Sequence, residues 1–397
     1  MTESSSGPAL RPISLYIHVP FCTVKCAYCD FNSYANAEEQ IPGWEAALLE
    51  ELRRWAPVVQ NRPVATVFVG GGTPSLLEVG SVERIMNAIA DGYALASDAE
   101  ITMEANPEST RLERLRGYRA SGVNRLSIGV QSLDPDELKF LDRLHDVNGA
   151  REAVSSARRA GFDNVSVDLI YGLPNQSLAT WQTSLNGALD WGPDHISCYA
   201  LTVEEETPLA SRVASGNVRE IDPDVAAEMT DWTEERLADA GYGQYEISNY
   251  ARPGRECQHN LVYWRHREYV GLGPGAHGFV DGVRYSVDRS PGRYIGTLKR
   301  SGGSHGQPSP AVVAVEIVDD GTAALDATVM GLRLNAGIEP VEFARMYGAA
   351  WDRFATALTW AEGADLLEKD GTRLRLTRRG RRLANEVFVR LMEPELV

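Results

Sequence analysis

The sequence has no excess of positive charge and no apolar segment long enough to cross a membrane. Its 39 Lys and Arg stand against 55 Asp and Glu, which gives a formal net charge of −16. Such a charge repels a polyphosphate chain, so nucleic acid is excluded as a main partner. A run of about 18 apolar residues is lacking, and the N-terminal MTESSSGPAL has no signal-peptide core. These absences predict a cytoplasmic protein without a transmembrane segment.

Cysteine is scarce, with five in 397 residues. The odd number and the clustering exclude a disulfide framework in a reducing compartment, because three of the five, Cys22, Cys26 and Cys29, lie on one short segment. Three thiolates there can hold three irons of a [4Fe–4S] cube and leave the fourth iron open to an exchangeable ligand. The alternatives are zinc with His18 as a fourth ligand, or buried thiols. We favour the cluster, since the cysteines do not form two separated pairs and His18 lies in a strand pattern.

Strand and helix patterns alternate up to about residue 200. The strand-like runs are SLYIHV, ATVFV, EITMEA, RLSIGV, VSVDLI and HISCYA, with amphipathic stretches such as WEAALLEELRRW between most of them. Six strands with intervening helices predict a parallel α/β domain, and both an open sheet and a partial barrel are compatible with the pattern. In either arrangement, residues that follow the strand ends are expected to meet at one site.

The rest of the chain predicts four further segments around this domain. We expect a loose tail at 1–12, the α/β domain at 13–220, an extension at 221–300, a linker at 301–310 and a small helical, winged-helix-like domain at 311–397. The extension contains a long helix near 226–240 and then an irregular stretch rich in glycine and aromatic residues, to about residue 280. The last domain has one strand-like run, RLRL, before its final helix. The following arginines are candidate nucleic-acid contacts, but the acidic composition favours a solvated helix start: Arg378, Arg379, Arg381 and Arg382.

Glycines and polar residues lie at or near the ends of the predicted strands. The glycines at 70–72 let the backbone approach a ligand closely, although three glycines alone more often mark a turn. Asp168 lies within an apolar strand, where a carboxylate is costly to bury unless it is paired. It is therefore expected to face a ligand cavity, with Arg143 as a cationic partner or as an ordinary surface arginine. Glu104 closes the third strand, and its alternative role is a cap on the following helix.

The C-x3-C-x2-C spacing, with Tyr28 directly before the last cysteine, resembles the signature of the radical S-adenosylmethionine (SAM) superfamily. With LYIHVPFC, FVGGGTPS, the strand that holds Glu104, RLSIGVQS, VDLIYGLP and GLGPGAHGF, most of the chain resembles the oxygen-independent coproporphyrinogen III oxidase group. The resemblance implies a partial (β/α)6 TIM-like barrel, a [4Fe–4S] cluster on the three cysteines, and SAM chelating the open iron. It places SAM-binding positions at Tyr16, Tyr28, Gly71, Gly72, Thr73, Glu104, Gln131, Arg143, Asp168, Ala200 and His277.

Two departures separate the chain from those oxidases. The resemblance to the oxidases implies the pattern C-x3-C-x2-C-x-C, which ends in a fourth cysteine. In this chain, Phe31 occupies that last position. The oxidases also carry a longer N-terminal segment over the substrate pocket, whereas the first predicted strand begins near Ser14. Both features resemble the HemW haem-chaperone branch instead. That branch implies haem as a cargo and a haem-accepting protein as a partner, and it is compatible with a homodimer and with transient contact with a membrane protein.

The segment RPGRECQHNLVYWRHREY, residues 252–269, concentrates what an iron porphyrin needs. Cys257 and His259 are candidate axial ligands, and Tyr263 and Trp264 offer flat apolar faces. The alternative is a helix that begins near Asn260, with core aromatics and solvated arginines. The pattern H-N-x-x-Y-W in this segment resembles the sequence associated with haem binding in HemW proteins. The arginines that could pair with propionates are Arg252, Arg255, Arg265 and Arg267.

The leading hypothesis is a haem chaperone that binds one haem and passes it to an acceptor protein. The cluster and SAM would then serve structural, dimerising or gating roles. The rival hypothesis is an enzyme of porphyrin biosynthesis, coproporphyrinogen III dehydrogenase, which uses radical chemistry. A third is another radical reaction on a tetrapyrrole, such as haem ring opening. The sequence assigns no catalytic residue and leaves open which side chain ligates haem iron.

Overall fold

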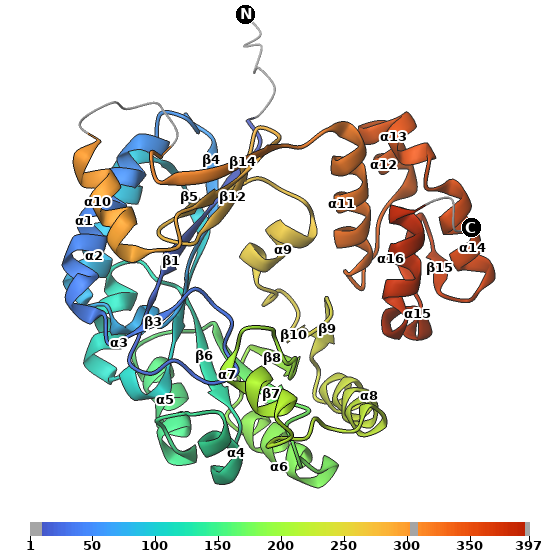
Figure 1. Cartoon of the computed structure of the whole chain (residues 1–397), viewed down its shortest axis with the longest axis horizontal. Helices are drawn as coiled ribbons and strands as arrows, with labels where there is room; N and C mark the ends of the chain where they lie inside the picture. Colours follow the sequence, from blue (N-terminus) through green and yellow to red (C-terminus); the bar gives the residue numbers. More distant parts are fainter. Residues whose placement is uncertain (1–9, 302–308, 394–397) are drawn as a thin grey trace, which may run out of the picture.

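The computed structural model describes residues 10–301 and 309–393, and it is built around one mixed sheet of twelve strands (Figure 1). Six strands that are adjacent in the sheet run parallel, each beside the next along the chain. They are the six strands predicted from the sequence, so the α/β prediction is confirmed. Their bounds are β1 Ile13–Val19, β4 Pro63–Gly71, β5 Ala94–Ala105, β6 Arg125–Gln131, β7 Val165–Tyr171 and β8 His195–Ala200.

Each parallel strand has an apolar outer face and a polar inner face, because successive side chains of a strand point to opposite sides. In β1, Leu15 and Ile17 are fully buried in the main hydrophobic core, together with Leu48 of α1. The residue between them in the strand, Tyr16, faces the other side, where its ring stacks on Phe68 of β4. The inside of the sheet is therefore lined by polar and aromatic side chains, and the core lies between the sheet and its outer helices.

The outer helices follow the amphipathic patterns of the sequence. In α5 the buried residues Ala150, Ala153, Val154 and Ala157 recur at intervals of three and four, and the side chain of Asp146 caps the helix by accepting from the amide of Gly149 at 2.7 Å. The helices up to β9 are α1 Ile41–Trp55, α2 Val79–Gly92, α3 Leu112–Ala120, α4 Pro135–Phe140, α5 Val147–Arg159, α6 Leu178–Leu189, α7 Pro208–Ala214 and α8 Pro223–Asp239.

The stretch to about residue 280 that was predicted to be irregular forms ordered structure on both edges of the parallel sheet, so that prediction is wrong, and the residues that follow it extend the same sheet. The strands β9 Gly243–Gln244 and β10 Asn249–Ala251 extend the β8 edge. The strands β11 Tyr269–Leu272, β12 His277–Val280, β13 Val283–Val287 and β14 Val312–Ile317 extend the β1 edge. The helices here are α9 Gln258–Trp264 and α10 Pro291–Arg300. Each of these strands has two to six residues, which is too short for a clear alternation of polar and apolar positions.

The C-terminal region is helical and has a hydrophobic core of its own. Its helices are α11 Asp320–Leu332, α12 Pro340–Tyr347, α13 Ala349–Asp352, α14 Ala355–Gly363, α15 Arg378–Arg382 and α16 Ala384–Met392. Its core includes Leu332, Phe354 and Phe388, all separate from the core of the sheet. The predicted RLRL strand is β16 Arg373–Leu376, and it pairs with a strand that the sequence analysis did not predict, β15 Leu367–Asp370.

Three of the four arginines at the start of α15 pair with carboxylates of α8. Arg378 lies 3.1 Å from carboxylate oxygens of both Asp231 and Glu235. Arg382 also pairs with Asp231. These pairs join the C-terminal region to the parallel-sheet part of the molecule. Arg378, Arg379 and Arg382 remain exposed, as expected for a solvated helix start.

Two sequence predictions fall largely outside the described residues. Of the tail predicted at 1–12, the structure describes 10–12, and of the linker predicted at 301–310 it describes 301, 309 and 310. Among the helices that the structure describes, none is both long and apolar enough to span a bilayer.

Candidate functional site

A cavity of about 370 Å³ lies at the carboxyl ends of the parallel strands. All three clustered cysteines line it, together with residues from β4, β5, β6, β7 and β8. Nine of the eleven predicted SAM positions also line it, namely Tyr28, Gly71, Gly72, Thr73, Glu104, Gln131, Arg143, Asp168 and Ala200. The other two, Tyr16 and His277, are not among the lining residues. The fold thus brings together residues that are up to 182 positions apart, as Cys22 and Glu204 are.

The three cysteines are free thiols that border one space. Cys22 ends the short strand β2 Phe21–Cys22, and its sulfur accepts from the Thr73 hydroxyl at 3.5 Å. The loop then turns back on itself, with the amide of Cys29 donating to the carbonyl of Cys26 at 3.1 Å. Burial raises the pKa of the Cys22 and Cys29 thiols, so without a metal they are protonated at neutral pH. Three thiols around a shared cavity fit a multi-iron cluster, whose positive irons would hold them as thiolates.

The zinc alternative finds no support in the geometry. Both ring nitrogens of His18 are already engaged, Nδ1 with the Tyr16 hydroxyl and Nε2 with the Asn32 carbonyl oxygen, each at 2.9 Å. Within residues 10–301 and 309–393, no three His, Cys, Asp or Glu side chains are arranged to hold a single metal ion. His18 is therefore a packed neighbour of the site, as its place in β1 suggests.

The glycine segment after β4 is fixed by a carboxylate of the next strand. The amide of Gly71 donates to Oε2 of Glu104 at 3.0 Å. Gly71 has φ of +114°, and a Cβ there would lie 2.6 Å from the His18 ring, so only glycine fits. Burial raises the pKa of Glu104 to about 8. The alternative role of Glu104 as a helix cap is wrong, because its carboxylate faces the cavity and holds the glycine backbone.

Asp168 lies inside the sheet and is solvated by hydroxyl groups. It accepts hydrogen bonds from Ser197 at 2.7 Å, from Ser127 at 3.0 Å and from Ser166 at 3.3 Å. Burial raises the pKa of this carboxyl group, although the three hydroxyls and the charge of Arg125 lower it. The expectation that Asp168 faces a cavity is met, since it lines the cysteine cavity.

Arg143 is neither the partner of Asp168 nor a surface arginine, so both predicted roles are wrong. Its guanidinium donates to Oδ1 of Asn106 at 2.7 Å and to the carbonyl of Gly129 at 2.9 Å. A further nitrogen lies 3.9 Å from the sulfur of Cys26. Arg143 therefore places a positive charge beside the cysteine loop, where a cluster bound by three thiolates would carry negative charge.

A chain of hydrogen bonds leads from Asp168 away from the cavity into the sheet interior. The hydroxyl of Ser166, which donates to Asp168, is 2.8 Å from Nδ1 of His195, and Nε2 of His195 is 2.9 Å from the hydroxyl of Tyr245. The side chain of Asn260 in α9 lies against that hydroxyl. Burial lowers the pKa of His195 well below its usual value, so its ring is neutral and relays hydrogen bonds without carrying charge.

The helix α9, which holds the predicted haem residues, packs against the inner face of the sheet beneath this chain. Glu100 of β5 accepts from the amides of Gln258 and His259, each at 3.0 Å, and thereby caps the helix. The sulfur of Cys257 lies 3.5 Å from the same carboxylate. Burial raises the pKa of the Cys257 thiol to about 12, so it is protonated at neutral pH.

His259 is 1% exposed, and both of its ring nitrogens are engaged. Nδ1 is 2.7 Å from the hydroxyl of Thr66 in β4, and Nε2 is 2.9 Å from the hydroxyl of Tyr263. Burial lowers the pKa of His259 to about 3, so its ring is neutral. In this conformation the two candidate axial ligands, Cys257 and His259, are core residues, and no residue of the H-N-x-x-Y-W pattern lines the cysteine cavity. The alternative of a helix near residue 260 is met by α9, whereas Tyr263 and Trp264, which it expected in the core, are half-buried.

The four arginines that flank α9 differ in their surroundings. Arg252 stacks on the Tyr242 ring, 5.2 Å from its centre. Arg255 is half-buried, whereas Arg265 and Arg267 are exposed. Among the described residues, none of these four forms an ion pair with a carboxylate. Other arginines of this acidic protein do form such pairs, as Arg378 and Arg382 of α15 do with α8.

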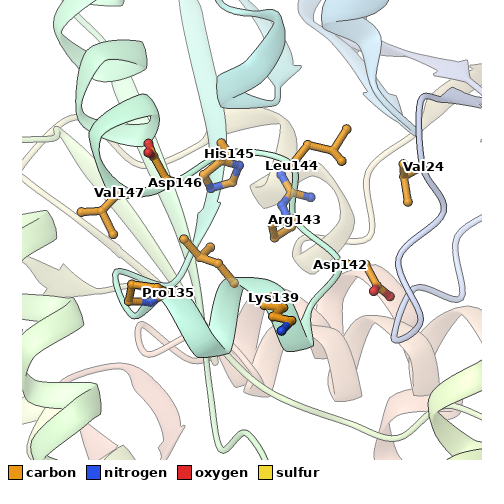
Figure 2. Close-up of a pocket in the computed structure, with 10 residues that line it drawn as sticks. Val24, Pro135, Lys139, Asp142, Arg143, Leu144, His145, Asp146 and Val147 are labelled. Carbon is orange, nitrogen blue, oxygen red and sulfur yellow. The ribbon is translucent and has the colours of Figure 1, made fainter.

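A second hollow of about 410 Å³ lies outside the cysteine loop. Figure 2 shows Asp142, Arg143 and Leu144 on the segment between α4 and α5, with Val24 of the cysteine loop beside them. The carboxylate of Asp142 accepts from the amide of Ala27 at 3.0 Å, so this segment braces the cysteine loop from outside. The hollow contains no cysteine, and we assign the cofactor chemistry to the cavity instead.

Sequence reasoning missed three polar residues of the site. Asn106 lines the cavity and bonds both Arg143 and the Thr73 hydroxyl. Ser127 lines it and bonds Asp168. Arg125 is 2% exposed and forms no ion pair within the described residues, although it lies within electrostatic range of Asp168. Two signals were available. Asn106 lies two residues after Glu104, and every second position of RLSIGVQ is polar or glycine.

Comparison with protein families gives two matches that agree with this geometry. Residues 16–186 match the Radical SAM superfamily, and residues 320–383 match the HemN C-terminal domain. The first range contains the three clustered cysteines and, of the six strands predicted from the sequence, all except the start of β1 and β8. The second contains most of the separate C-terminal core.

Curated relatives match from about three quarters to nearly all of the chain. Heme chaperone HemW of Mycobacterium tuberculosis is 40% identical over 387 residues, which cover 96% of this chain and 95% of that protein. Heme chaperone HemW of Bacillus subtilis is 34% identical over 378 residues, with 94% and 98% covered. Heme chaperone HemW of Escherichia coli is 42% identical over 297 residues, with 72% and 78% covered.

Among solved structures, coproporphyrinogen III oxidase (HemN) of Escherichia coli has the same fold. The TM-score is 0.83, and the match covers 97% of this chain and 91% of that chain. The sequences are 23% identical, so this likeness establishes the architecture and nothing about the reaction.

Proposed function

Because the chain belongs to the HemW haem-chaperone family of radical SAM proteins, we propose that it binds haem and passes it to an acceptor protein. The observation that carries this proposal is the similarity to HemW proteins along nearly the full length, at 40% identity over 387 residues. A haem-binding protein without a transmembrane helix in its described residues suits transfer in the cytoplasm, either to a soluble acceptor or to an acceptor in the membrane.

The cysteine cavity would hold a [4Fe–4S] cluster with SAM at its open iron. Cys22, Cys26 and Cys29 supply three thiolates, which leaves one iron without a protein ligand. When both are bound, the cluster can donate an electron to the sulfonium of SAM. The wall offers Glu104 and Asp168 as acceptors for the ammonium and ribose hydroxyl groups of SAM, and the glycines at 71–72 allow its close approach.

In a chaperone, the contents of the cavity would affect haem binding at α9 and would not convert a substrate. The hydrogen-bond chain from Asp168 through Ser166, His195 and Tyr245 to Asn260 connects the cavity wall to α9. Cluster and SAM would therefore have a structural or gating role for the haem segment. The same role is compatible with a homodimer that forms when the cavity is filled.

Ligation of haem iron by α9 would require a rearrangement. His259 would have to give up its bond to Thr66 or to Tyr263, and Cys257 its contact with Glu100. We propose that Asn260, Tyr263 and Trp264 remain part of the haem site and that loading loosens the contact of α9 with the inner face of the sheet.

The rival activity is the oxidative decarboxylation of coproporphyrinogen III. The fold alone does not separate the two, since HemN shares it. Phe31 occupies the position of the fourth cysteine in the pattern of the oxidases. It lines the cavity and is 58% exposed.

Anaerobic incubation of the reconstituted protein with SAM, a reductant and either haem or coproporphyrinogen III distinguishes the two functions. We expect spectral evidence of stoichiometric haem binding and no protoporphyrinogen. Repeated turnover of coproporphyrinogen III would replace our proposal with the oxidase, and a linear tetrapyrrole product from haem would replace it with ring opening.

A further inference from the structure

The end of α9 meets the C-terminal region at a junction of aromatic and cationic side chains. Arg333, directly after α11, places its guanidinium carbon 5.9 Å from the centre of the Trp264 ring and 5.0 Å from that of Phe388 in α16. Figure 1 shows α9 between the sheet and α11, and the two helices are in contact. A cation is thus held between an aromatic ring of the H-N-x-x-Y-W pattern and one of the C-terminal core.

Several polar atoms at this junction are buried without a partner. They are Nε of Arg333, the indole nitrogen of Trp264 and Oδ1 of Asn335, whereas the amide nitrogen of Asn335 donates to the carbonyl of Gln244 at 2.9 Å. Two of the three are donors, and they come from different helices. Buried polar groups in native proteins nearly always bond to protein, water or ligand. The indole nitrogen of Trp264 and Nε of Arg333 are donors without a protein partner, and they belong to side chains in contact with each other, so an acceptor that reached both would satisfy them.

The charges at the junction favour a ligand with negative charge. Arg265 and Arg267 project at the end of α9, are exposed and form no ion pair among the residues that the structure describes. Burial lowers the pKa of Arg265, as do the neighbouring charges of Arg267 and Arg373, while Glu256 opposes this. Arg373 is itself bonded to Glu339 at 2.8 Å. The remaining cationic charge repels itself, and an anion would relieve that repulsion.

The carboxylates near the junction do not neutralise it. Asp326 of α11, 4.0 Å from the ring of His266, is paired with Arg284. The charge of Glu246 raises the pKa of Arg333. The hydrogen bonds of Glu246 itself come from the segment 247–249, and one of its carboxylate oxygens has no partner. Burial raises the pKa of Glu246, which favours its uncharged form. Glu256 lies at the opposite end of α9, before its first turn.

We propose that this junction, formed by Trp264, Arg265 and Arg267 of the α9 end together with Arg333 and Asn335 of the C-terminal region, binds the propionate carboxylates of haem. The inference rests on the proposed haem function and deepens it, because it assigns part of the haem site to the C-terminal region. Guanidinium groups pair with carboxylates through two parallel hydrogen bonds, and the indole nitrogen of Trp264 adds a donor beside an aromatic face. The two halves of the chain would thus close on one haem.

The test compares haem with haem dimethyl ester, in which both propionates are uncharged. We expect the wild-type protein to bind haem about tenfold or more tightly than the ester, since charge-assisted bonds of this kind are each worth about a tenfold change or more in affinity. Arg265→Gln should lower the affinity for haem about tenfold and leave that for the ester unchanged. Arg333→Gln should act in the same way and would locate the C-terminal contribution, with thermal unfolding as the check that it folds.

The matched control is Arg116→Gln, which removes one arginine from exposed α3, where it pairs only with Glu113. It should leave both affinities unchanged. Equal loss of haem and ester affinity in Arg265→Gln, or no loss of either, would overturn the propionate site while leaving haem binding intact. Failure of the wild-type protein to bind either porphyrin would contradict the proposed function itself and this inference with it.

Discussion

The carboxylate of Glu104 accepts a hydrogen bond from the backbone amide of Gly71, with 3.0 Å between oxygen and nitrogen. This bond joins the ends of β5 and β4 at the wall of the cysteine cavity. It fixes a glycine segment that no other residue type could form, and it consumes one oxygen of a carboxylate that is otherwise costly to bury. The arrangement makes sense if a cationic ligand binds there, because the ligand then compensates for that cost.

The glycine segment gives the first prediction. Gly71→Ala places a methyl group 2.6 Å from the His18 ring at a φ of +114°, which costs on the order of 1–3 kcal/mol in strain. We expect a lower melting temperature and at least tenfold weaker SAM binding, measured by calorimetry on the reconstituted protein. Gly92→Ala is the control, since its Cβ would meet only the Ala56 methyl at 3.6 Å. Binding and melting like the wild type would contradict the assigned role of Gly71.

A pH dependence follows from Glu104. Its pKa is raised from 4.5 to about 8 by burial, so between these values the folded protein holds a proton that the unfolded chain has lost. Stability therefore falls as the pH rises through this window. Without cluster or SAM, Glu104→Gln should lose less stability than the wild type between about pH 5 and about pH 8, as followed by denaturant unfolding. Exposed Glu83→Gln should follow the wild type, and superimposable curves for all three proteins would refute the prediction.

The cysteine loop and α9 are separate sites in this structure. Replacing Cys22, Cys26 and Cys29 together by Ala should abolish the iron–sulfur absorbance and leave appreciable haem binding, because α9 contributes nothing to the cavity wall. Cys198→Ala is the matched control, since Cys198 is buried in β8 away from the cavity lining and should keep the cluster. Simultaneous loss of the cluster and of haem binding would mean that the two sites are one.

The next prediction concerns His259 of α9, which is hydrogen-bonded to both Thr66 and Tyr263. His259→Ala should lower the free energy of unfolding of the haem-free protein by about 1–3 kcal/mol, through loss of buried hydrogen bonds. Thr66→Val removes one of these bonds and keeps the imidazole. If the ring ligates iron after loading, Thr66→Val should tighten haem binding while His259→Ala weakens it. Equal haem affinities in both variants and the wild type would rule out His259 as the ligand.

Much of the fold was predictable because the parallel strands are long and bury one apolar face. In β1 the buried Leu15 and Ile17 alternate with Tyr16 and His18, and this period of two is visible in the sequence. The short strands β9 to β13 were not predictable, since pairing with an existing sheet edge stabilises them. Gly271 illustrates this, because a Cβ at this position would lie 1.8 Å from the carbonyl oxygen of His277 on the neighbouring strand.

The sequence predicted most residues of the candidate site but few of the hydrogen bonds between them. The cysteine spacing and the positions after the strands identified most lining residues, because a parallel sheet gathers its carboxyl ends at one edge. The partners of Asp168 and Arg143 depend on side-chain packing across strands, which no local pattern encodes. The buried state of His259 was likewise hidden, because its bond to Thr66 spans 193 positions of the chain.

The central claim is tested most directly by haem transfer. Protein loaded with one haem is mixed under anaerobic conditions with an apo haem protein carrying a distinguishable absorption maximum, and the acceptor spectrum is followed over time. We predict that the acceptor gains haem faster from this protein, with its cluster and SAM in place, than from albumin that carries an equal concentration of haem. Transfer no faster than from albumin, or no transfer at all, would contradict the proposal that this protein is a haem chaperone.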